Sequence, residues 1–266
     1  MSSKPHIAVV GAGIVGICSA YFLNKSGFQV TLIDKNDPGS MTSYGHACTF
    51  ADYACVPINS TNLFKDVPSM LMRSDGPLSI DFFYMIKNIN WALRFLRNSS
   101  RNNVNNISEA LANILKSASV SYDEIFSDVE VSNYIRNEEA IYLYKNEIAY
   151  LKAKRANAIR KKNGVEIQIL SQNDVLDLEP NLARVFHNGQ LFIGSRHTTN
   201  PSAISKKIFE SFINNGGIFK KQNVINITPK ETLVNLNYNN NNYNFDKVVI
   251  CAGSWSNNLT KKFGEN

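Results

Sequence analysis

The sequence has few residues of the kinds that build metal sites and disulfide frameworks. Only four of its 266 residues are cysteine and four are histidine, and no two cysteines form a C-x-x-C pair. This spacing predicts neither a zinc site nor a disulfide-stapled domain, so we expect reduced thiols, as in a cytoplasmic protein. The residues concerned are Cys18, Cys48, Cys55, Cys251, His6, His46, His187 and His197.

Concentrated charge is also missing. The net charge is +6 and the pI is near 9.0, but the basic residues are mostly dispersed, which argues against nucleic acid as a partner. One local cluster falls on an expected helix at residues 150–162, and we interpret it as a solvated helix face rather than a membrane contact. The cluster comprises Lys152, Lys154, Arg155, Arg160, Lys161 and Lys162.

The composition does not indicate disorder. With 44% hydrophobic and 11% aromatic residues, the chain can bury a sizeable core in one large domain or two interleaved ones. Residues 7–23 are apolar and follow Lys4, so a secretory segment or membrane anchor is an alternative at the N-terminus. Two features argue against that alternative. Three glycines stand at motif spacing, and the strand expected at residues 28–34 would lose its partner if the segment were removed.

The glycines belong to an ordered pattern, I-A-V-V-G-A-G-I-V-G, at residues 7–16. In a dinucleotide-binding strand-helix-strand unit, a glycine at position 11 permits a tight turn, Gly13 lets a pyrophosphate approach the backbone, and Gly16 lets the helix pack on the strand. Asp34 ends the second strand, where an acid accepts a hydrogen bond from a ribose hydroxyl. The segment therefore predicts a dinucleotide-binding site.

The rest of the chain alternates between strand and helix patterns. A loop is expected at residues 43–56, a helical region from Pro77, a helix at 108–126, a strand at 141–144 and a short helix at 173–178. The helical region carries an apolar stripe that we expect to be core. The stripe consists of Phe82, Phe83, Met85, Ile86, Ile89, Trp91, Leu93, Phe95 and Leu96.

Towards the C-terminus a strand is expected at residues 190–193, followed by a helix that begins at Asn200-Pro201 and ends at Gly216-Gly217. Strands are then expected at residues 223–227, 232–238 and 243–250. The run of four asparagines at residues 239–242 predicts a polar hairpin tip. The last strand leads into the segment C-A-G-S-W-S.

These motifs together resemble those of the FAD-dependent D-amino-acid oxidase superfamily: G-x-G-x-x-G-x-x-x-A from Gly11 to Ala20, the acid Asp34, and V-V-I-C-A-G-S-W-S from residue 248. The loop T-S-Y-G-H-A-C at residues 42–48 resembles the T-S-x-x-N-x-G loop of bacterial D-amino-acid dehydrogenase small subunits. The resemblance implies an α/β fold, in which a Rossmann-like FAD-binding domain is interrupted by a largely helical α+β substrate region. The implied limits are 1–75 and 190–266 for the FAD-binding parts and 76–189 for the insert.

The resemblance also implies FAD rather than a nicotinamide cofactor, whereas the glycines alone indicate only a dinucleotide. Val224 would reach the adenine, and the segment from Ala252 to Trp255 would line the pyrophosphate and adenosine side; a simple turn at the end of a strand is the alternative for Ala252-Gly253. The implied cofactor-binding residues are Val10, Gly11, Gly13, Ile14, Val15, Gly16, Asp34, Lys35, Ser43, His46, Val224, Ala252, Gly253 and Trp255.

The sequence departs from the dehydrogenase loop at His46 and Cys48, which stand where the family carries Asn and Gly. In relatives that oxidise dimethylglycine or sarcosine, a histidine in a similar S-x-x-H-A context holds the flavin covalently. Two hypotheses follow for His46: covalent attachment, or a hydrogen bond near the cofactor.

A second departure is that the family continues beyond the position of Asn266 with a portion that supplies an Arg and a Tyr for the substrate carboxylate. Arg184, Arg196 and His197 could replace them, but surface or interdomain ion pairing is the favoured interpretation. We therefore assign no catalytic residue and no metal ligand. We expect a shortened chain to react poorly and to aggregate or to need a partner chain.

The implied enzyme takes an amino acid, oxidises its CH–NH2 group to an imine that water hydrolyses to a 2-oxo acid and ammonia, and passes electrons to a respiratory acceptor. A cytoplasmic location, peripheral to the inner face of the membrane, would suit that acceptor. Two alternatives remain open: a non-catalytic FAD-binding fragment, and a sarcosine- or glycine-type amine oxidase.

Overall fold

The computed structural model describes residues 4–59 and 81–263, which form two compact units. The first unit comprises Met1–Cys48, Asp123–Arg136 and Thr198–Asn266, and the second comprises Thr49–Tyr122 and Asn137–His197. The expected boundary at residues 75/76 and the expected helix start at Pro77 lie outside the described residues. The domain limits 1–75, 76–189 and 190–266 stay a prediction.

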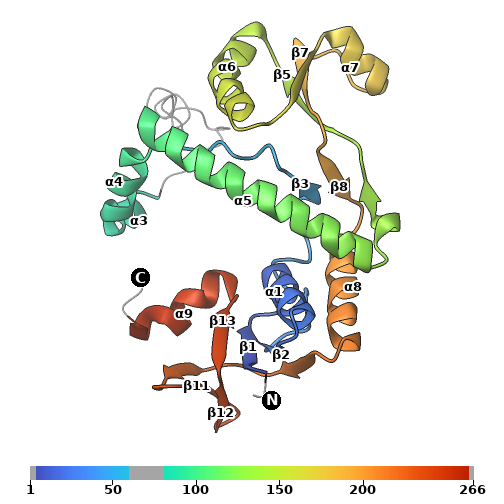
Figure 1. The fold of residues 1–266 in the computed structure, drawn as a ribbon. Helices are drawn as coiled ribbons and strands as arrows, with labels where there is room; N and C mark the ends of the chain where they lie inside the picture. Colours follow the sequence, from blue (N-terminus) through green and yellow to red (C-terminus); the bar gives the residue numbers. More distant parts are fainter. Residues whose placement is uncertain (1–3, 60–80, 264–266) are drawn as a thin grey trace. The chain divides into compact units, whose positions relative to one another are not determined.

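A parallel four-stranded sheet is the centre of the first unit (Figure 1). Its order is β13-β1-β2-β9, and its inner strands are nearly all buried, as expected for a parallel sheet covered on both faces. Helices α1 and α8 pack against each other. This α/β, Rossmann-like arrangement confirms the expected fold class. The elements are β1 (His6–Val10), α1 (Ile14–Lys25), β2 (Gln29–Asp34), α8 (Pro201–Asn214), β9 (Ile218–Lys221) and β13 (Lys247–Ile250).

An antiparallel three-stranded meander formed by β10 (Asn226–Pro229), β11 (Val234–Tyr238) and β12 (Asn241–Phe245) lies against the parallel sheet. Asn239 and Asn240 turn the chain between β11 and β12 with φ angles of 51° and 58°. Two successive positive φ angles are typical of a two-residue type I′ turn. The predicted hairpin tip is confirmed at these two asparagines, whereas the other two asparagines of the run begin β12.

The strand expected at residues 243–250 is wrong as a single element. The chain breaks at Asp246, whose N–H donates to the carbonyl of His6 at 2.9 Å and whose carboxylate accepts from the N–H of His6 at 2.6 Å. Residues before the break join the meander and residues after it join the parallel sheet. The apolar pattern runs through the break because Phe245, Val248 and Ile250 all pack into one core.

The strand expected at residues 223–227 is also misplaced. The strand that follows the glycine pair is β9, which pairs with β2 from Thr31↔Ile218 to Asp34↔Lys221. It is an edge strand with mostly exposed side chains, so it lacks the apolar run that marks an inner strand. The chain reaches Val224 between β9 and β10.

The core between the parallel sheet and the meander holds residues from both. Side chains alternate along a strand, so one set of residues from β1 and β2 faces the meander and the other set faces the helices. The buried cluster on the meander side is formed by Ala8, Val10, Ile33, Ile227, Leu236, Tyr238 and Phe245.

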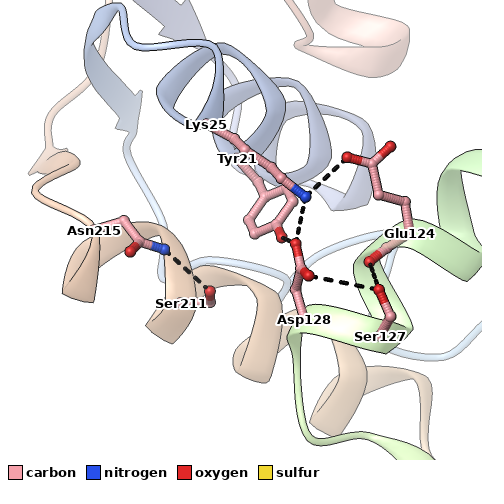
Figure 2. A network of polar contacts seen from close by, with 7 residues as sticks. All are labelled: Tyr21, Lys25, Glu124, Ser127, Asp128, Ser211 and Asn215. Carbon is pink, nitrogen blue, oxygen red and sulfur yellow. Dashed lines mark hydrogen bonds and ion pairs between the residues drawn. The ribbon is translucent and has the colours of Figure 1, made fainter.

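The C-terminal end of α1 is tied to the last turns of α5 (Arg101–Asp128) by a polar network (Figure 2). The Tyr21 hydroxyl donates to Asp128 Oδ2 at 2.7 Å, and Lys25 Nζ lies 2.8 Å from Glu124 Oε1 and also contacts Asp128. The pKa of Asp128 is lowered, chiefly by its hydrogen bonds with Lys25 and Tyr21. Burial, with a further contribution from Asp128, raises the pKa of Tyr21 to about 12. Residues 124–128 are thereby held against α1 within the first unit.

The second unit contains an antiparallel sheet of order β5-β7-β6, with Ala140↔Phe192 and Ile167↔Phe192 in register. Helix α7 begins with a capping box in which Ser171 and Asp174 each bind the other's backbone N–H. β6 and β8 were not predicted because they are short and partly exposed. The elements are β3 (Thr49–Phe50), β5 (Ala140–Tyr144), α6 (Glu147–Lys162), β6 (Ile167–Leu170), α7 (Gln172–Leu178), β7 (Asn188–Phe192) and β8 (Arg196–Thr198).

The expected core stripe of the helical region is wrong where the structure describes its side chains. Phe83 is 85% exposed, Trp91 66% and Leu93 57%, and Ile86, Ile89 and Leu96 are exposed as well. The periodicity correctly indicated amphipathic helices, α3 (Phe82–Lys87) and α4 (Ile89–Arg97), but periodicity does not say what covers the apolar face. None of the helices in residues 4–59 and 81–263 has the length and hydropathy needed to cross a membrane.

The basic cluster on α6 separates into two groups. Its four lysines are exposed, as predicted, but Arg155 and Arg160 are half-buried. Arg160 donates to the carbonyl of Tyr53 at 3.2 Å and to Asn157 Oδ1 at 3.0 Å, and it lies 5.4 Å from the centroid of the Phe192 ring. Tyr53 in turn stacks on Phe192 with centroids 4.0 Å apart. Arg160 therefore packs in the second unit instead of belonging to a solvated face.

The remaining short elements follow these units along the chain. They are η1 (Ser132–Tyr134), β4 (Ile135–Arg136), η2 (Gly253–Trp255), α9 (Ser256–Thr260) and η3 (Lys261–Phe263).

Candidate cofactor-binding site

The turn between β1 and α1 requires glycine at two positions. Gly11 has a φ of +108°, its N–H donates to the carbonyl of Ile33 at 2.8 Å, and a Cβ there would lie 2.4 Å from the carbonyl oxygen of Cys251. A Cβ on Gly16 would lie 1.7 Å from the carbonyl oxygen of Gly11. Such distances are far below contact, so both positions exclude every side chain. The close packing predicted for Gly16 is confirmed.

Gly13 differs from the other two glycines. Its φ of −71° suits any residue, and a Cβ would meet only Ser43 Oγ at 3.3 Å. It is the N-cap of α1, and Ser43 Oγ accepts a hydrogen bond from the N–H of Ile14 at 2.9 Å. The first turn of a helix has N–H groups without intrahelical acceptors and a partial positive charge, so this end of α1 suits an anion.

Asp34 is fixed at the end of β2 by two backbone donors. The N–H of Ala12 reaches Oδ2 at 2.7 Å, and the N–H of Asn36 reaches Oδ1 at 2.8 Å. The side chain thus bridges the glycine turn and the chain after β2. Each carboxylate oxygen keeps a further lone pair, which can accept from a ligand hydroxyl.

The segment after β13 faces the glycine turn. The N–H of Cys251 donates to the carbonyl of Val10 at 2.7 Å, and Gly253 has a φ of +56° at the start of η2. Trp255 is 48% exposed, and Lys35 Nζ lies 5.9 Å from the centroid of its ring. A cation and an aromatic face, drawn from chain segments far apart in the sequence, therefore meet at one side of the turn.

A cavity of about 610 Å³ brings these features together within the first unit. The predicted residues that line it are Val10, Gly11, Gly13, Ile14, Val15, Asp34, Lys35, Ser43, Val224, Ala252, Gly253 and Trp255. Sequence reasoning missed further lining residues, which are Ile33, Asn36, Met41, Thr42, Gln222, Asn223, Cys251, Ser254, Asn258 and Leu259. Most of these follow a strand of the parallel sheet, and that topological position was the signal that could have found them.

Gly16 and His46 are not among the cavity-lining residues. Gly16 affects the cavity indirectly, because its lack of a side chain allows α1 to approach the turn. His46 is exposed, and its carbonyl accepts from the thiol of Cys48 at 3.3 Å. A role of His46 in binding the cofactor stays a prediction.

Cys48 adopts a φ of 64°, a conformation that favours glycine. This position is the one at which the resembling dehydrogenase loop carries Gly. The backbone therefore keeps the turn that the family pattern implies, although the residue type has changed. A cysteine in this conformation is strained by roughly 1–2 kcal/mol.

The thiol that lines the cavity, Cys251, is a poor nucleophile. Burial raises the pKa of Cys18 to about 12 and also raises the pKa of Cys251, so both remain protonated thiols. Within residues 4–59 and 81–263, no group of three or more His, Cys, Asp or Glu side chains could hold a metal ion. Arg184 donates to Gln172 and Asn173 on the surface, and His197 lies 3.9 Å from Glu138.

The residues present fit a dinucleotide. Exposed backbone N–H groups at a helix N-terminus suit a pyrophosphate, the fixed carboxylate of Asp34 suits a ribose, and the cavity extends from one to the other. Bulky groups are excluded from the turn by the backbone contacts at Gly11 and Gly16.

Comparison with known proteins gives the same result. Residues 6–266 match the model of the FAD dependent oxidoreductase (DAO) family. The chain is 25% identical over 275 residues to a D-amino-acid oxidase of Bradyrhizobium diazoefficiens, covering 100% of this chain and 64% of that protein. It is 28% identical over 180 residues to D-amino acid dehydrogenase 2 of Ralstonia nicotianae, covering 67% of this chain and 42% of that protein. The chain thus spans less than two thirds of each of these relatives.

Solved structures show the same fold at lower identity. Glycine oxidase from Geobacillus kaustophilus superposes with a TM-score of 0.67 at 15% identity, covering 99% of this chain and 60% of that one. L-amino acid deaminase from Proteus vulgaris superposes with a TM-score of 0.70 at 12% identity, covering 100% and 51%.

Proposed function

Because the chain belongs to the FAD dependent oxidoreductase family, we propose that it carries the FAD-binding part of an enzyme that oxidises the CH–NH2 group of a D-amino acid to a 2-oxo acid and ammonia. The observation that carries the substrate class is the alignment of the whole chain with a D-amino-acid oxidase. The T-S-Y-G-H-A-C loop supports it. FAD, when bound, supplies the two-electron acceptor for such an oxidation.

The residues of the cavity have distinct roles in this proposal. The N–H groups of Gly13 and Val15 bind the pyrophosphate, while that of Ile14 is taken by Ser43 Oγ, which supports the turn. Asp34 accepts from a ribose hydroxyl. Lys35 and Trp255 cover the adenosine side together with Val224, while Val10, Gly11, Ala252 and Gly253 shape the floor.

Binding can be tested separately from turnover. FAD affinity, followed by quenching of flavin fluorescence, should fall by at least about tenfold, or ~1.4 kcal/mol, in Gly13→Glu, because a carboxylate would enter the anion site. Asn214→Glu is the matched control, since it adds the same charge at an exposed position at the end of α8. Equal affinities in both variants would contradict the proposed site.

Turnover decides among the proposed substrates. We expect D-alanine to be oxidised with an artificial dye as acceptor in preference to oxygen, in keeping with a respiratory acceptor at the inner face of the membrane. Oxidation of sarcosine or glycine with oxygen would favour the amine-oxidase alternative. A folded chain that binds FAD but oxidises none of the three would contradict the proposed activity and favour the alternative of a non-catalytic FAD-binding chain.

His46 supports the amine-oxidase alternative through its S-x-x-H-A context, and we propose that it is the attachment site if the flavin is covalent. Acid precipitation should then leave yellow colour in the protein pellet of the wild type and release it to the supernatant in His46→Asn. Complete release from the wild type would exclude the linkage. If His46 only forms a hydrogen bond near the flavin, His46→Asn should weaken FAD binding. The flavin should then be released to the supernatant from both the wild type and the variant.

A further inference from the structure

The outer strand of the meander, β12, presents a row of asparagines at an open edge. The sheet order is β10-β11-β12, and within the part of the chain that the structure describes β12 pairs only with β11. Asn241, Asn242 and Asn244 are exposed. We propose that this edge pairs with β12 of a second copy of the chain, in an antiparallel arrangement related by a two-fold axis.

The side chains already form a ladder inside one copy. Asn235 Nδ2 donates to Asn244 Oδ1 at 3.0 Å, and Asn237 Nδ2 donates to Asn242 Oδ1 at 3.1 Å. Each primary amide has two hydrogens and two lone pairs, so Asn242 and Asn244 each retain a donor and an acceptor on the outer side. Ladders of identical asparagines also stabilise stacked strands in cross-β assemblies.

The backbone of the same residues also faces the open edge. In a two-residue hairpin the pair that flanks the turn, Tyr238 and Asn241, is hydrogen-bonded, and hydrogen-bonded pairs then alternate with pairs that are not. Asn237 and Asn242 fall in a pair of the second kind. The carbonyl of Asn237 accordingly accepts from the N–H of Ile225 at 2.9 Å, on the side away from β12. The N–H and C=O groups of Asn242 and Asn244 therefore point outward.

One register between the two β12 strands pairs both the side-chain amides and the backbone groups of Asn242 and Asn244. With the two-fold axis at Tyr243, Asn242 of one copy faces Asn244 of the other, and each such pair exchanges two backbone hydrogen bonds. The amide of Asn244 then reaches the amide of Asn242 in the partner copy, so the ladder continues from Asn235 across four strands. A second copy supplies this pattern because a two-fold interface requires a self-complementary surface.

The two edges of the meander are protected differently. β10 carries Pro229, which has no N–H to offer to a new strand, and Lys230 follows it. β12 contains no Lys, Glu, Asp or Pro. An edge strand without such residues can accept a further strand. We therefore expect pairing at β12 rather than at β10.

The mass of the full chain in solution tests the proposal. Light scattering across a concentration series should give twice the monomer mass for the wild type and the monomer mass for the double variant Asn242→Lys/Asn244→Lys, because like charges would face each other across the axis. The matched control is Asn214→Lys/Asn215→Lys, which adds the same charge at two exposed positions at the end of α8. A wild type that stays monomeric, or a dimer that survives the edge charges, overturns the proposal.

Amide hydrogen exchange provides a second measurement on the wild type, which stands even if the lysine variant fails to fold. The backbone N–H groups of Asn242 and Asn244 should exchange slowly at high protein concentration and quickly on dilution, while those of Asn241 and Tyr243 should not change. Fast exchange at Asn242 and Asn244 at every concentration would exclude an edge-to-edge pairing.

Discussion

The two ends of α1 are built in opposite ways. At its N-terminus, Gly13 has no side chain to cap the helix, and the turn around it lines the cavity. At its C-terminus, Tyr21 and Lys25 are held by Asp128 and Glu124 of α5 (Figure 2). One end borders the cavity with its backbone turn, and the other is fixed by side chains within the protein.

If the N-terminal end binds the pyrophosphate, as we propose, one helix serves both binding and stability. An anion site needs N–H groups that the protein has left without partners, and each such group costs stability when it is not satisfied. The ion pairs and the buried phenol at the far end hold the helix in place without occupying the site. Changes at the two ends should therefore affect different properties.

The largest effect is expected at Gly16. A Cβ in Gly16→Ala would meet the carbonyl oxygen of Gly11 at 1.7 Å, so the turn must move, and the free energy of unfolding should fall by about 3 kcal/mol or more. FAD binding should be lost as well. Urea unfolding measures the change, and Gly45→Ala, which has open space around its Cβ, should change it by less than about 0.5 kcal/mol.

Removing the hydroxyl that supports the N-terminal end should have a smaller effect. Ser43→Ala leaves the N–H of Ile14 without its acceptor, and we expect a loss of about 1 kcal/mol in the free energy of unfolding together with weaker FAD binding. Ser40→Ala is the control, because Ser40 is exposed and donates only to the carbonyl of Asp37 in its own turn. Equal losses in the two variants would contradict the assigned role of Ser43.

At the opposite end, Tyr21→Phe should lower stability without changing FAD affinity. The variant removes a part-buried hydrogen bond to Asp128 while Lys25 still pairs with that carboxylate, so a loss of about 1 kcal/mol is expected. Tyr44→Phe removes an exposed hydroxyl and should be neutral. A tenfold loss of FAD affinity in Tyr21→Phe would show that the two ends are coupled.

The raised pKa of Tyr21 predicts that the stability of the protein changes at alkaline pH. Folding raises the pKa of Tyr21 from near 10 to about 12, so the unfolded chain releases the phenolic proton first as the pH rises. The stabilisation by Tyr21 is therefore complete below about pH 10 and is lost as the pH approaches about 12. The difference in melting temperature between the wild type and Tyr21→Phe should narrow over that range. A constant difference would count against the raised pKa.

The smallest effect is expected at Cys48, in the loop that also contains Ser43. Cys48→Gly should relieve about 1 kcal/mol of strain at a φ of 64° and cost roughly half of that in chain entropy. We expect a net gain of about 0.5 kcal/mol in the free energy of unfolding. Thermal unfolding of the wild type and of both Cys48→Gly and Cys48→Ala can check this, since the alanine variant should gain nothing.

Sequence reasoning identified the cavity well because its requirements are local. Gly11 and Gly16 are fixed by backbone contact, Asp34 by its place at the end of a strand, and these constraints leave a readable pattern. Twelve of the fourteen predicted cofactor-binding residues line the cavity. The cap formed by Ser43 was not foreseen as a cap, because a contact across 29 positions leaves no periodic signal.

The strand limits and the apolar stripe that the sequence predicts incorrectly have a different cause. The break at Asp246 lies inside an unbroken apolar alternation, since both strands face one core, and the edge strand β9 has too few buried side chains to stand out. The stripe on α3 and α4 is exposed where its side chains are described, although the amphipathic pattern favours a covering layer. A sequence pattern gives the direction of an apolar face but not its neighbour.

Asp34 receives a backbone hydrogen bond at each of its oxygens in the protein itself. Its rotational freedom is thus removed when the chain folds, and a nucleotide that binds later does not have to immobilise the side chain. Preorganisation of this kind strengthens binding by lowering the entropy loss of association. It also means that a shift of the backbone at Ala12 or Asn36 would weaken nucleotide affinity by releasing the carboxylate, even though Asp34 itself is unchanged.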